Sequence, residues 1–262
     1  MMLEINGQAV YAATGNRPLD PARETVIFVH GTGQDHSIWV LPIRYFARHD
    51  RNVLAVDLPG HGRSGGAALE TVEAIADWLI ELLDTAGLDR AAIVGHSLGS
   101  LAAIAAAARH PNRVRAIALV GTALPMPVSA GLLEAAKNNR QEAIDMLNFW
   151  GFSQSAQLGG NPTPGNWMLG AGLRLMERAR PGVIYADLNA CNEYTAGPDH
   201  AARVECPALL VLGERDRLTP PRAARILAET LPHAETAILP GCGHAMLAER
   251  PDSVLDQLIK VV

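Results

Sequence analysis

Short apolar, β-branched runs recur along this chain with helical patterns between them, and this alternation is the feature that most limits how the chain can fold. Each run is continuously apolar, which is typical of parallel strands whose two faces are both covered by helices. Connections of this kind build an α/β fold around a mostly parallel sheet. The predicted strands lie at 26–31, 52–60, 91–97, 114–121, 208–216 and 234–241.

Apolar residues at helical spacing fill the intervals between these runs. They follow a helical period over 72–83, 226–231 and 254–259, as expected of helices that pack on a sheet. The segment 98–109 is dominated by alanine, which has high helix propensity and lets a helix approach the sheet closely. We expect this last helix to pack at the centre of the sheet.

The β/α rhythm lapses between residues 122 and 200. Helical stretches at 132–150 and 168–180 are separated there by a Gly/Pro-rich loop. We therefore expect an α/β core over 1–121 and 201–262, with a helical cap over 122–200 inserted after the strand at 114–121.

Aromatic and methionine side chains gather in this cap. They supply enough apolar surface either to close the cap's own core or to line a substrate cavity. For any single residue, a core position is the simpler interpretation. As candidate substrate contacts in the cap we take Met146, Trp150 and Trp167.

Charge and composition exclude several classes of protein. The chain has 262 residues, enough for one large catalytic domain. Its formal net charge is −5 and it has no run of lysine or arginine, so nucleic acid is not an expected partner. The first residues do not resemble a secretory signal, and the longest apolar segment, 98–108, is far shorter than the roughly 20 residues that span a bilayer. We expect a cytoplasmic protein with a small-molecule substrate and no membrane partner.

Three cysteines are widely separated and form no CxxC pair. Neither a disulfide framework nor a zinc site is indicated, so we predict no metal. Cys242 precedes His244 by two residues, but we expect it to be a bystander because Ser97 has the better context for a nucleophile.

The segment Gly95-His96-Ser97-Leu98-Gly99 fits the pattern G-x-S-x-G, directly after a predicted strand and directly before the alanine-rich helix. By chance such a pattern would be a surface turn. The strand-turn-helix context instead predicts a strained turn that exposes the serine hydroxyl, with glycines where a Cβ would collide. We predict Ser97 as nucleophile.

A second loop, His30-Gly31-Thr32-Gly33, follows the strand at 26–31. We predict that the backbone N–H groups of Thr32 and Leu98 hold an oxyanion, with Gly33 as the alternative to Thr32. His30 is interpreted as a structural histidine of the loop. Gly31 and His96, which adjoin the predicted donor and nucleophile, are candidate substrate contacts.

A serine hydroxyl needs a base, and nine histidines compete for that role. His244 lies in a late loop before a C-terminal helix, from which it can reach the carboxyl edge of the sheet. The other histidines fall at helix ends, in turns or inside the serine motif. A carboxylate must then orient the base, and Asp216, at the end of a predicted strand, is the candidate, with Glu214 the alternative.

These residues, together with the segment 57–64 (DLPGHGRS), resemble the α/β-hydrolase superfamily, particularly its carboxylesterase, lactonase and non-haem haloperoxidase-like members. The resemblance implies an eight-stranded, mostly parallel sheet, a Ser-Asp-His triad that needs no cofactor, and a variable cap that sets substrate choice. Haloalkane dehalogenases and epoxide hydrolases carry aspartate at the position of Ser97, so they are less similar. We interpret DLPGHGRS as a structural loop.

Three functions follow as hypotheses. The first is hydrolysis of a carboxylic ester or lactone through an acyl-enzyme. The second uses the same triad for C–C bond hydrolysis of β-diketone type, acyl transfer or perhydrolysis. The third is a protein that binds a small ligand without turning it over. Fold and triad alone do not separate the first two, and they leave substrate, stereoselectivity and oligomeric state open.

Overall fold

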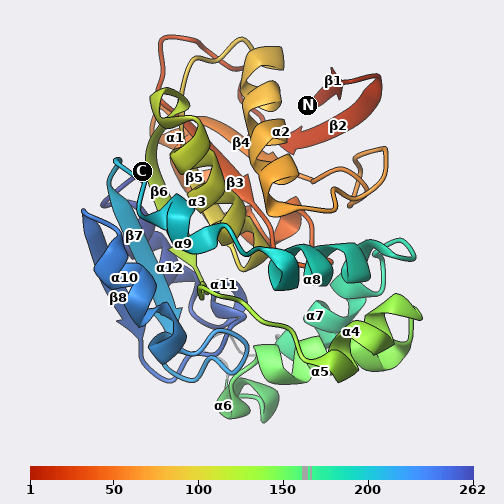
Figure 1. Ribbon diagram of the computed structural model, residues 1–262. Helices are drawn as coiled ribbons and strands as arrows, with labels where there is room; N and C mark the ends of the chain where they lie inside the picture. Colours follow the sequence, from red (N-terminus) through yellow and green to blue (C-terminus); the bar gives the residue numbers. More distant parts are fainter. Residues whose placement is uncertain (161–164, 166) are drawn as a thin grey trace.

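The computed structural model describes residues 1–160, 165 and 167–262. An eight-stranded sheet runs through the molecule in the order β1-β2-β4-β3-β5-β6-β7-β8, and β2 alone runs in the direction opposite to the other strands (Figure 1). The predicted α/β fold with a mostly parallel sheet is confirmed. The strands are β1 Met2–Ile5, β2 Gln8–Ala13, β3 Thr25–Val29, β4 Asn52–Val56, β5 Ala91–His96, β6 Val114–Val120, β7 Ala208–Gly213 and β8 Ala234–Leu239.

The first two strands form a hairpin that the apolar runs do not reveal. β1 and β2 are joined by Asn6 and Gly7, both at positive φ (51° and 73°). An Asn-Gly pair at positive φ is the preferred two-residue hairpin turn.

Helices cover both faces of the sheet, which explains the continuously apolar strands. Alternate residues of β3 show this: Val26 and Phe28 pack with α1 and α12, whereas Ile27 and Val29 pack with α2 and α3. α10 lies on the α2–α3 face. The helix bounds are α1 Val40–Arg48, α2 Val72–Thr85, α3 Leu98–Arg109, α10 Arg225–Thr230, α11 Met246–Glu249 and α12 Pro251–Leu258, with short 3-10 turns at His36–Trp39, Pro111–Arg113 and Pro221–Ala224.

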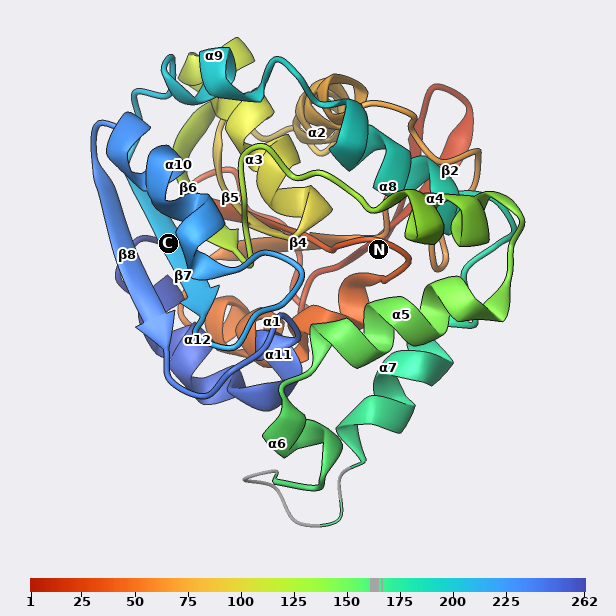
Figure 2. The ribbon, with the colours of Figure 1, turned by 60° about the horizontal axis from the view of Figure 1, so that its bottom comes forward.

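The insertion after β6 is helical, as predicted. Its helices are α4 Ala130–Lys137, α5 Gln141–Gly151, α6 Gln154–Gln157, α7 Met168–Met176, α8 Val183–Glu193 and α9 Gly197–Ala201. Figure 2 shows α4 to α7 gathered beyond one end of the sheet, with α5 beside α7. α8 contacts both α4 and the core helix α3, whereas α9 contacts α3 and extends one residue past the proposed cap boundary at 200.

The helices of the insertion are shorter than the continuous stretches expected, and α7 ends at Met176 and not near residue 180. The stretch 132–150 is divided between α4 and α5, because the chain turns at Asn139, which has a φ of 50°. The Gly/Pro-rich loop at 159–166 lies largely outside the described residues. Among the described residues, no helix is both long and apolar enough to cross a membrane.

Candidate active site

Ser97 occupies the sharp turn between β5 and α3. Its φ of 53° and ψ of −117° lie in a region that non-glycine residues rarely adopt. The Ser97 N–H donates to the carbonyl of Val120 on β6 at 2.9 Å, which fixes this strained backbone against the neighbouring strand. The side chain is half-buried and lines a cavity of about 740 Å³.

Two glycines let the strand and helix approach closely around this turn. A Cβ on Gly95 would lie 2.0 Å from the carbonyl oxygen of Gly99, and a Cβ on Gly99 would lie 2.4 Å from the carbonyl oxygen of Val29. Both contacts are to backbone, which cannot move away as a flexible side chain can. The G-x-S-x-G pattern therefore meets a steric need of this fold.

Replacing Gly95 with alanine should lower the free energy of unfolding by about 3 kcal/mol or more, because the added methyl overlaps the α3 backbone. Urea unfolding would measure it. Gly131→Ala on α4 is the matched control: nothing lies within 4 Å of its added Cβ, so that variant should be at least as stable as the wild type. A Gly95→Ala chain as stable as the wild type would show that the turn is looser than described.

His244 and Asp216 meet at the carboxyl edge of the sheet. Asp216 follows the end of β7, and His244 lies in the loop between β8 and α11. The His244 Nδ1 and the Asp216 Oδ2 are 2.7 Å apart, and both side chains are buried. The sequence-based pairing of these two residues, 28 positions apart, is therefore present in the structure.

Thr219 is a third member of this group that the sequence analysis did not identify. Its hydroxyl donates to the Asp216 Oδ2 at 2.7 Å and lies 3.0 Å from the His244 Nδ1. The Asp216 Oδ1 accepts the backbone N–H groups of Leu218 (2.9 Å) and Thr219 (2.8 Å). The carboxylate is thereby held in one orientation toward the imidazole.

These contacts keep Asp216 ionised despite its burial. Burial by itself raises the pKa of the Asp216 carboxyl, but the charge of His244 and the hydrogen bonds from His244 and Thr219 outweigh it and hold that pKa below its usual range. An ionised carboxylate at Nδ1 favours the imidazole tautomer that carries its proton there. The other ring nitrogen, Nε2, is then an acceptor.

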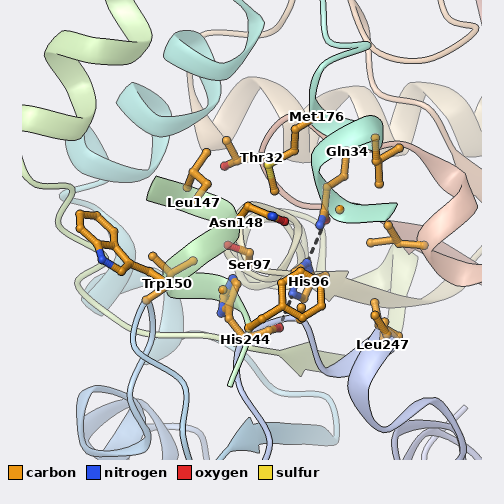
Figure 3. Close-up of a pocket in the computed structure, with 18 of the residues that line it drawn as sticks. Thr32, Gln34, His96, Ser97, Leu147, Asn148, Trp150, Met176, His244 and Leu247 are labelled. Carbon is orange, nitrogen blue, oxygen red and sulfur yellow. Dashed lines mark hydrogen bonds between the residues drawn. The ribbon is translucent and has the colours of Figure 1, made fainter. Parts of the chain in front are cut away.

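Ser97 and His244 line the same cavity, and Figure 3 shows them together in its wall. The His244 ring packs against Gly121, where a Cβ would lie 3.0 Å from the imidazole Cε1. The His244 carbonyl lies 3.1 Å from the His96 Nε2. Gly121 and His96 thus restrict where the imidazole can lie.

His96, a candidate substrate contact, lines the cavity, but it is poorly suited to be a base. Burial and the neighbouring His244 lower the pKa of His96 to about 3. Its Nδ1 lies 3.1 Å from the Gln34 Oε1, which also accepts the Gly31 N–H at 3.1 Å (Figure 3). Gln34, which the sequence analysis did not single out, thereby joins the two loops around Ser97.

The loop after β3 lies beside Ser97. A Cβ on Gly31 would be 3.1 Å from the Ser97 Cβ, although Gly31 is not among the described residues that line the cavity. Thr32 does line it. The Gly33 N–H, the alternative oxyanion donor, donates instead to Asp187 at 2.8 Å. Leu98 begins α3, where a backbone N–H has no acceptor within the helix.

The cavity is mainly apolar and lies between the sheet edge and the insertion. Of the three candidate substrate contacts in the cap, Trp150 lines it (Figure 3). The other two candidates are elsewhere: Met146 packs within the cluster formed by α4, α5 and α8, and Trp167 is 66% exposed, against Gly170. Leu147, Phe152, Met168 and Leu247 contribute apolar surface that periodicity alone did not assign to the cavity.

Two other features bear on the predictions for metals and thiols. Among the described residues, Asp35, His36 and Asp57 are close enough to share a metal ion. Their carboxylates already accept hydrogen bonds from nearby groups, including the N–H groups of Ser37 and His36, so the cluster is satisfied without one. Cys242 is fully buried, and burial raises the pKa of its thiol, which disfavours a nucleophilic role.

Most of the chain is similar to known proteins. Residues 26–257 match the model of the alpha/beta hydrolase family. The chain is 32% identical to the pimeloyl-[acyl-carrier protein] methyl ester esterase of Chromobacterium violaceum over 84% of this chain and 87% of that protein. It is 29% identical to the 2-hydroxy-6-oxononadienedioate/2-hydroxy-6-oxononatrienedioate hydrolase of Paraburkholderia phymatum, over 85% and 81%.

The fold is shared with the enol-lactonase of Burkholderia xenovorans LB400, with a TM-score of 0.84, 22% identity and coverage of 99% of this chain and 98% of that one. The homologues thus include an esterase and other hydrolases. Because the family model matches residues 26–257 and the chain is 32% identical to the esterase, the chain belongs to the alpha/beta hydrolase family.

Proposed function

We propose that this chain is a serine hydrolase that cleaves carboxylic esters or lactones through an acyl-enzyme on Ser97. The observation that carries the proposal is the buried hydrogen bond between Asp216 and His244 at the wall of the cavity that Ser97 also lines. A nucleophile, a base and a residue that orients the base are the three parts that such chemistry needs.

In the proposed mechanism, the His244 Nε2 takes the proton of Ser97 as its oxygen attacks the substrate carbonyl. Asp216 stabilises the imidazolium that forms. The N–H groups of Thr32 and Leu98 hold the oxyanion, a contribution of about 3 kcal/mol for each donor. Thr32 is preferred to Gly33 because the Gly33 N–H already donates to Asp187.

The second half of the reaction reverses these transfers. The imidazolium gives its proton to the leaving alcohol, or to the ring-opened alkoxide of a lactone. His244 then activates a water that attacks the acyl-enzyme and releases the acid. These steps use side chains, backbone amides and water, in keeping with the prediction that no cofactor is required.

The apolar cavity supports a substrate with a hydrocarbon acyl or alcohol group. A volume of about 740 Å³ is in the range of small-molecule sites. With p-nitrophenyl esters, kcat/KM should therefore rise as the acyl group lengthens from acetyl to hexanoyl, by up to about fourfold for each CH₂ (about 0.8 kcal/mol). Initial rates across the series, with Ser97→Ala as the background, measure this. A flat or falling series would contradict an apolar acyl site.

The same panel separates the esterase from the alternative reactions. It should contain lactones, thioesters and β-diketones beside the esters. The Paraburkholderia relative acts on a 2-hydroxy-6-oxo dienedioate, which favours C–C bond hydrolysis as the second candidate. Rapid hydrolysis of the diketones alone would replace our proposal with that one. Acyl transfer and perhydrolysis would appear as products when an alcohol or peroxide is added. A folded chain that binds such compounds but turns none of them over would instead be a ligand-binding protein.

A further inference from the structure

A buried carboxylate outside the triad contacts the backbone next to the proposed oxyanion donor. Asp187 lies on α8 of the insertion and is 1% exposed. Its Oδ2 accepts the Gly33 N–H at 2.8 Å, although the two residues are 154 positions apart in the sequence. The mechanism proposed above gives Asp187 no role.

The same oxygen also pairs with His61, in the loop after β4. The His61 Nε2 is 2.9 Å from the Asp187 Oδ2, and the His61 Nδ1 is 3.0 Å from the carbonyl oxygen of Pro59. Both ring nitrogens therefore face acceptors, and the acceptor at Nε2 is a buried carboxylate, so a doubly protonated imidazole can donate to both. Burial by itself lowers the pKa of His61, but the Asp187 charge and hydrogen bond outweigh it and raise that pKa above its usual value. The result is a buried ion pair.

A second buried histidine, His30, contacts the backbone of the same loop at Gly31. The His30 ring is 4.8 Å from that of His61, and burial together with the His61 charge lowers the pKa of His30 to about 4. The Leu58 N–H donates to the His30 Nε2 at 3.1 Å, so its Nδ1 carries the proton and donates to the Gly31 carbonyl at 2.9 Å. The pKa values of the two histidines are thus shifted in opposite directions.

The loop itself is a tight turn with Thr32 at its centre. The Gln34 N–H donates to the Gly31 carbonyl at 3.2 Å, and Gly33 has a φ of 64°. A positive φ at the third residue is typical of a type II turn, in which the peptide between the two central residues can flip. The Asp187 carboxylate accepts the N–H of that same peptide. It therefore favours one of the two orientations.

Other contacts from the insertion converge on this loop. Arg178 pairs with Asp35, and a Cβ on Gly33 would lie 2.9 Å from the Ile184 side chain. The segment 178–187 therefore packs along the loop, and Asp187 is its one buried charge that bonds to the turn's backbone.

We propose that Asp187 is a positioning residue: its carboxylate, paired with His61, anchors the turn at the Gly33 N–H and so holds the adjoining Gly31–Thr32 peptide where the Thr32 N–H faces the oxyanion formed at Ser97. This inference rests on the proposed function. In this inference, a residue of the insertion orients an oxyanion donor and does not itself contact the substrate. The substrate-binding cap and the oxyanion loop would then be joined by one buried ion pair.

The test compares Asp187→Asn and Asp187→Ala with the wild type, with each rate divided by the concentration of fluorophosphonate-titrated sites. Loss of one oxyanion donor lowers kcat by about 10²–10³, so the alanine variant should lose about 10- to 100-fold in kcat with KM within about threefold. Asparagine keeps an oxygen for the Gly33 N–H but loses the charge. The kcat of the asparagine variant should therefore fall only about fivefold, which is less than the loss in the alanine variant.

A trifluoromethyl ketone, which forms an oxyanion on the serine, distinguishes positioning from a merely structural role. Its affinity should fall in each variant by the same factor as kcat/KM. The exposed Glu193 on the same helix supplies the control, and Glu193→Gln should stay within about twofold of the wild type in both measurements.

Several outcomes would overturn the proposal. A folded alanine variant with wild-type kcat would do so, as would one in which only KM rises. If the alanine variant does not fold, the asparagine variant decides: kcat and analogue affinity both within twofold of the wild type would reject the role. A wild type that hydrolyses no ester and takes no label would overturn the proposed function as well, whereas an active wild type with unchanged variants overturns this inference alone.

Discussion

Replacing Ser97 with alanine should lower kcat for ester hydrolysis by at least about 10⁴-fold, because the hydroxyl that attacks the substrate carbonyl is lost. The fold should survive, since alanine is smaller than serine and keeps the Cβ already tolerated at this strained turn. Initial rates of p-nitrophenyl ester hydrolysis measure the effect, and circular dichroism checks that the variant is folded.

A contaminating esterase is the main source of error at such low rates. A contaminating serine esterase would be inhibited by a fluorophosphonate, as the wild-type chain is. Any residual activity that belongs to the Ser97→Ala chain itself should therefore persist after fluorophosphonate treatment. A folded alanine variant with more than a tenth of wild-type activity would remove Ser97 from the nucleophile's role.

Replacing Asp216 with asparagine should lower kcat by about 10⁴-fold at neutral pH while KM changes little. An amide N–H facing Nδ1 would favour the imidazole tautomer with its proton on Nε2, which cannot accept the proton of Ser97. Steady-state kinetics on purified, titrated enzyme measure the loss.

Glu214, the alternative carboxylate, supplies a matched control. It is near Asp216 in the sequence, but its Oε2 accepts the Gly241 N–H at 2.8 Å and its side chain is 48% exposed. Glu214→Gln should keep kcat within about threefold of the wild type. A large loss in Glu214→Gln beside a small one in Asp216→Asn would transfer the orienting role to Glu214.

The core of the fold could be predicted because its pattern is local. Continuously apolar strands separated by helical spacing identify β3 to β7, and the strand-turn-helix context places Ser97. β8 was predicted as the next run of the series, although it includes Glu235 and Thr236. The hairpin of β1 and β2 was missed because these strands are short and only partly apolar. The Asn-Gly pair at residues 6 and 7 was the available signal for it.

The parts that could not be predicted depend on contacts between distant segments. Periodicity shows that Trp150 and Trp167 belong to an apolar insertion, but which side of each helix faces the cavity is set by how α5 and α7 pack together. Thr219 follows Asp216 by only three residues, yet its role becomes visible only when His244 is brought beside it. The pairing of Asp187 with Gly33 and His61 joins three segments and has no local signal.

The central claim is that Ser97 carries the acyl group during turnover, and trapping that intermediate tests it most directly. The wild-type chain, quenched with acid during hydrolysis of a p-nitrophenyl ester, should gain the mass of one acyl group, and peptide mapping should place it on Ser97. An acyl group found on another residue, or continued turnover with no adduct at any quench time and no fluorophosphonate label on Ser97, would contradict the account.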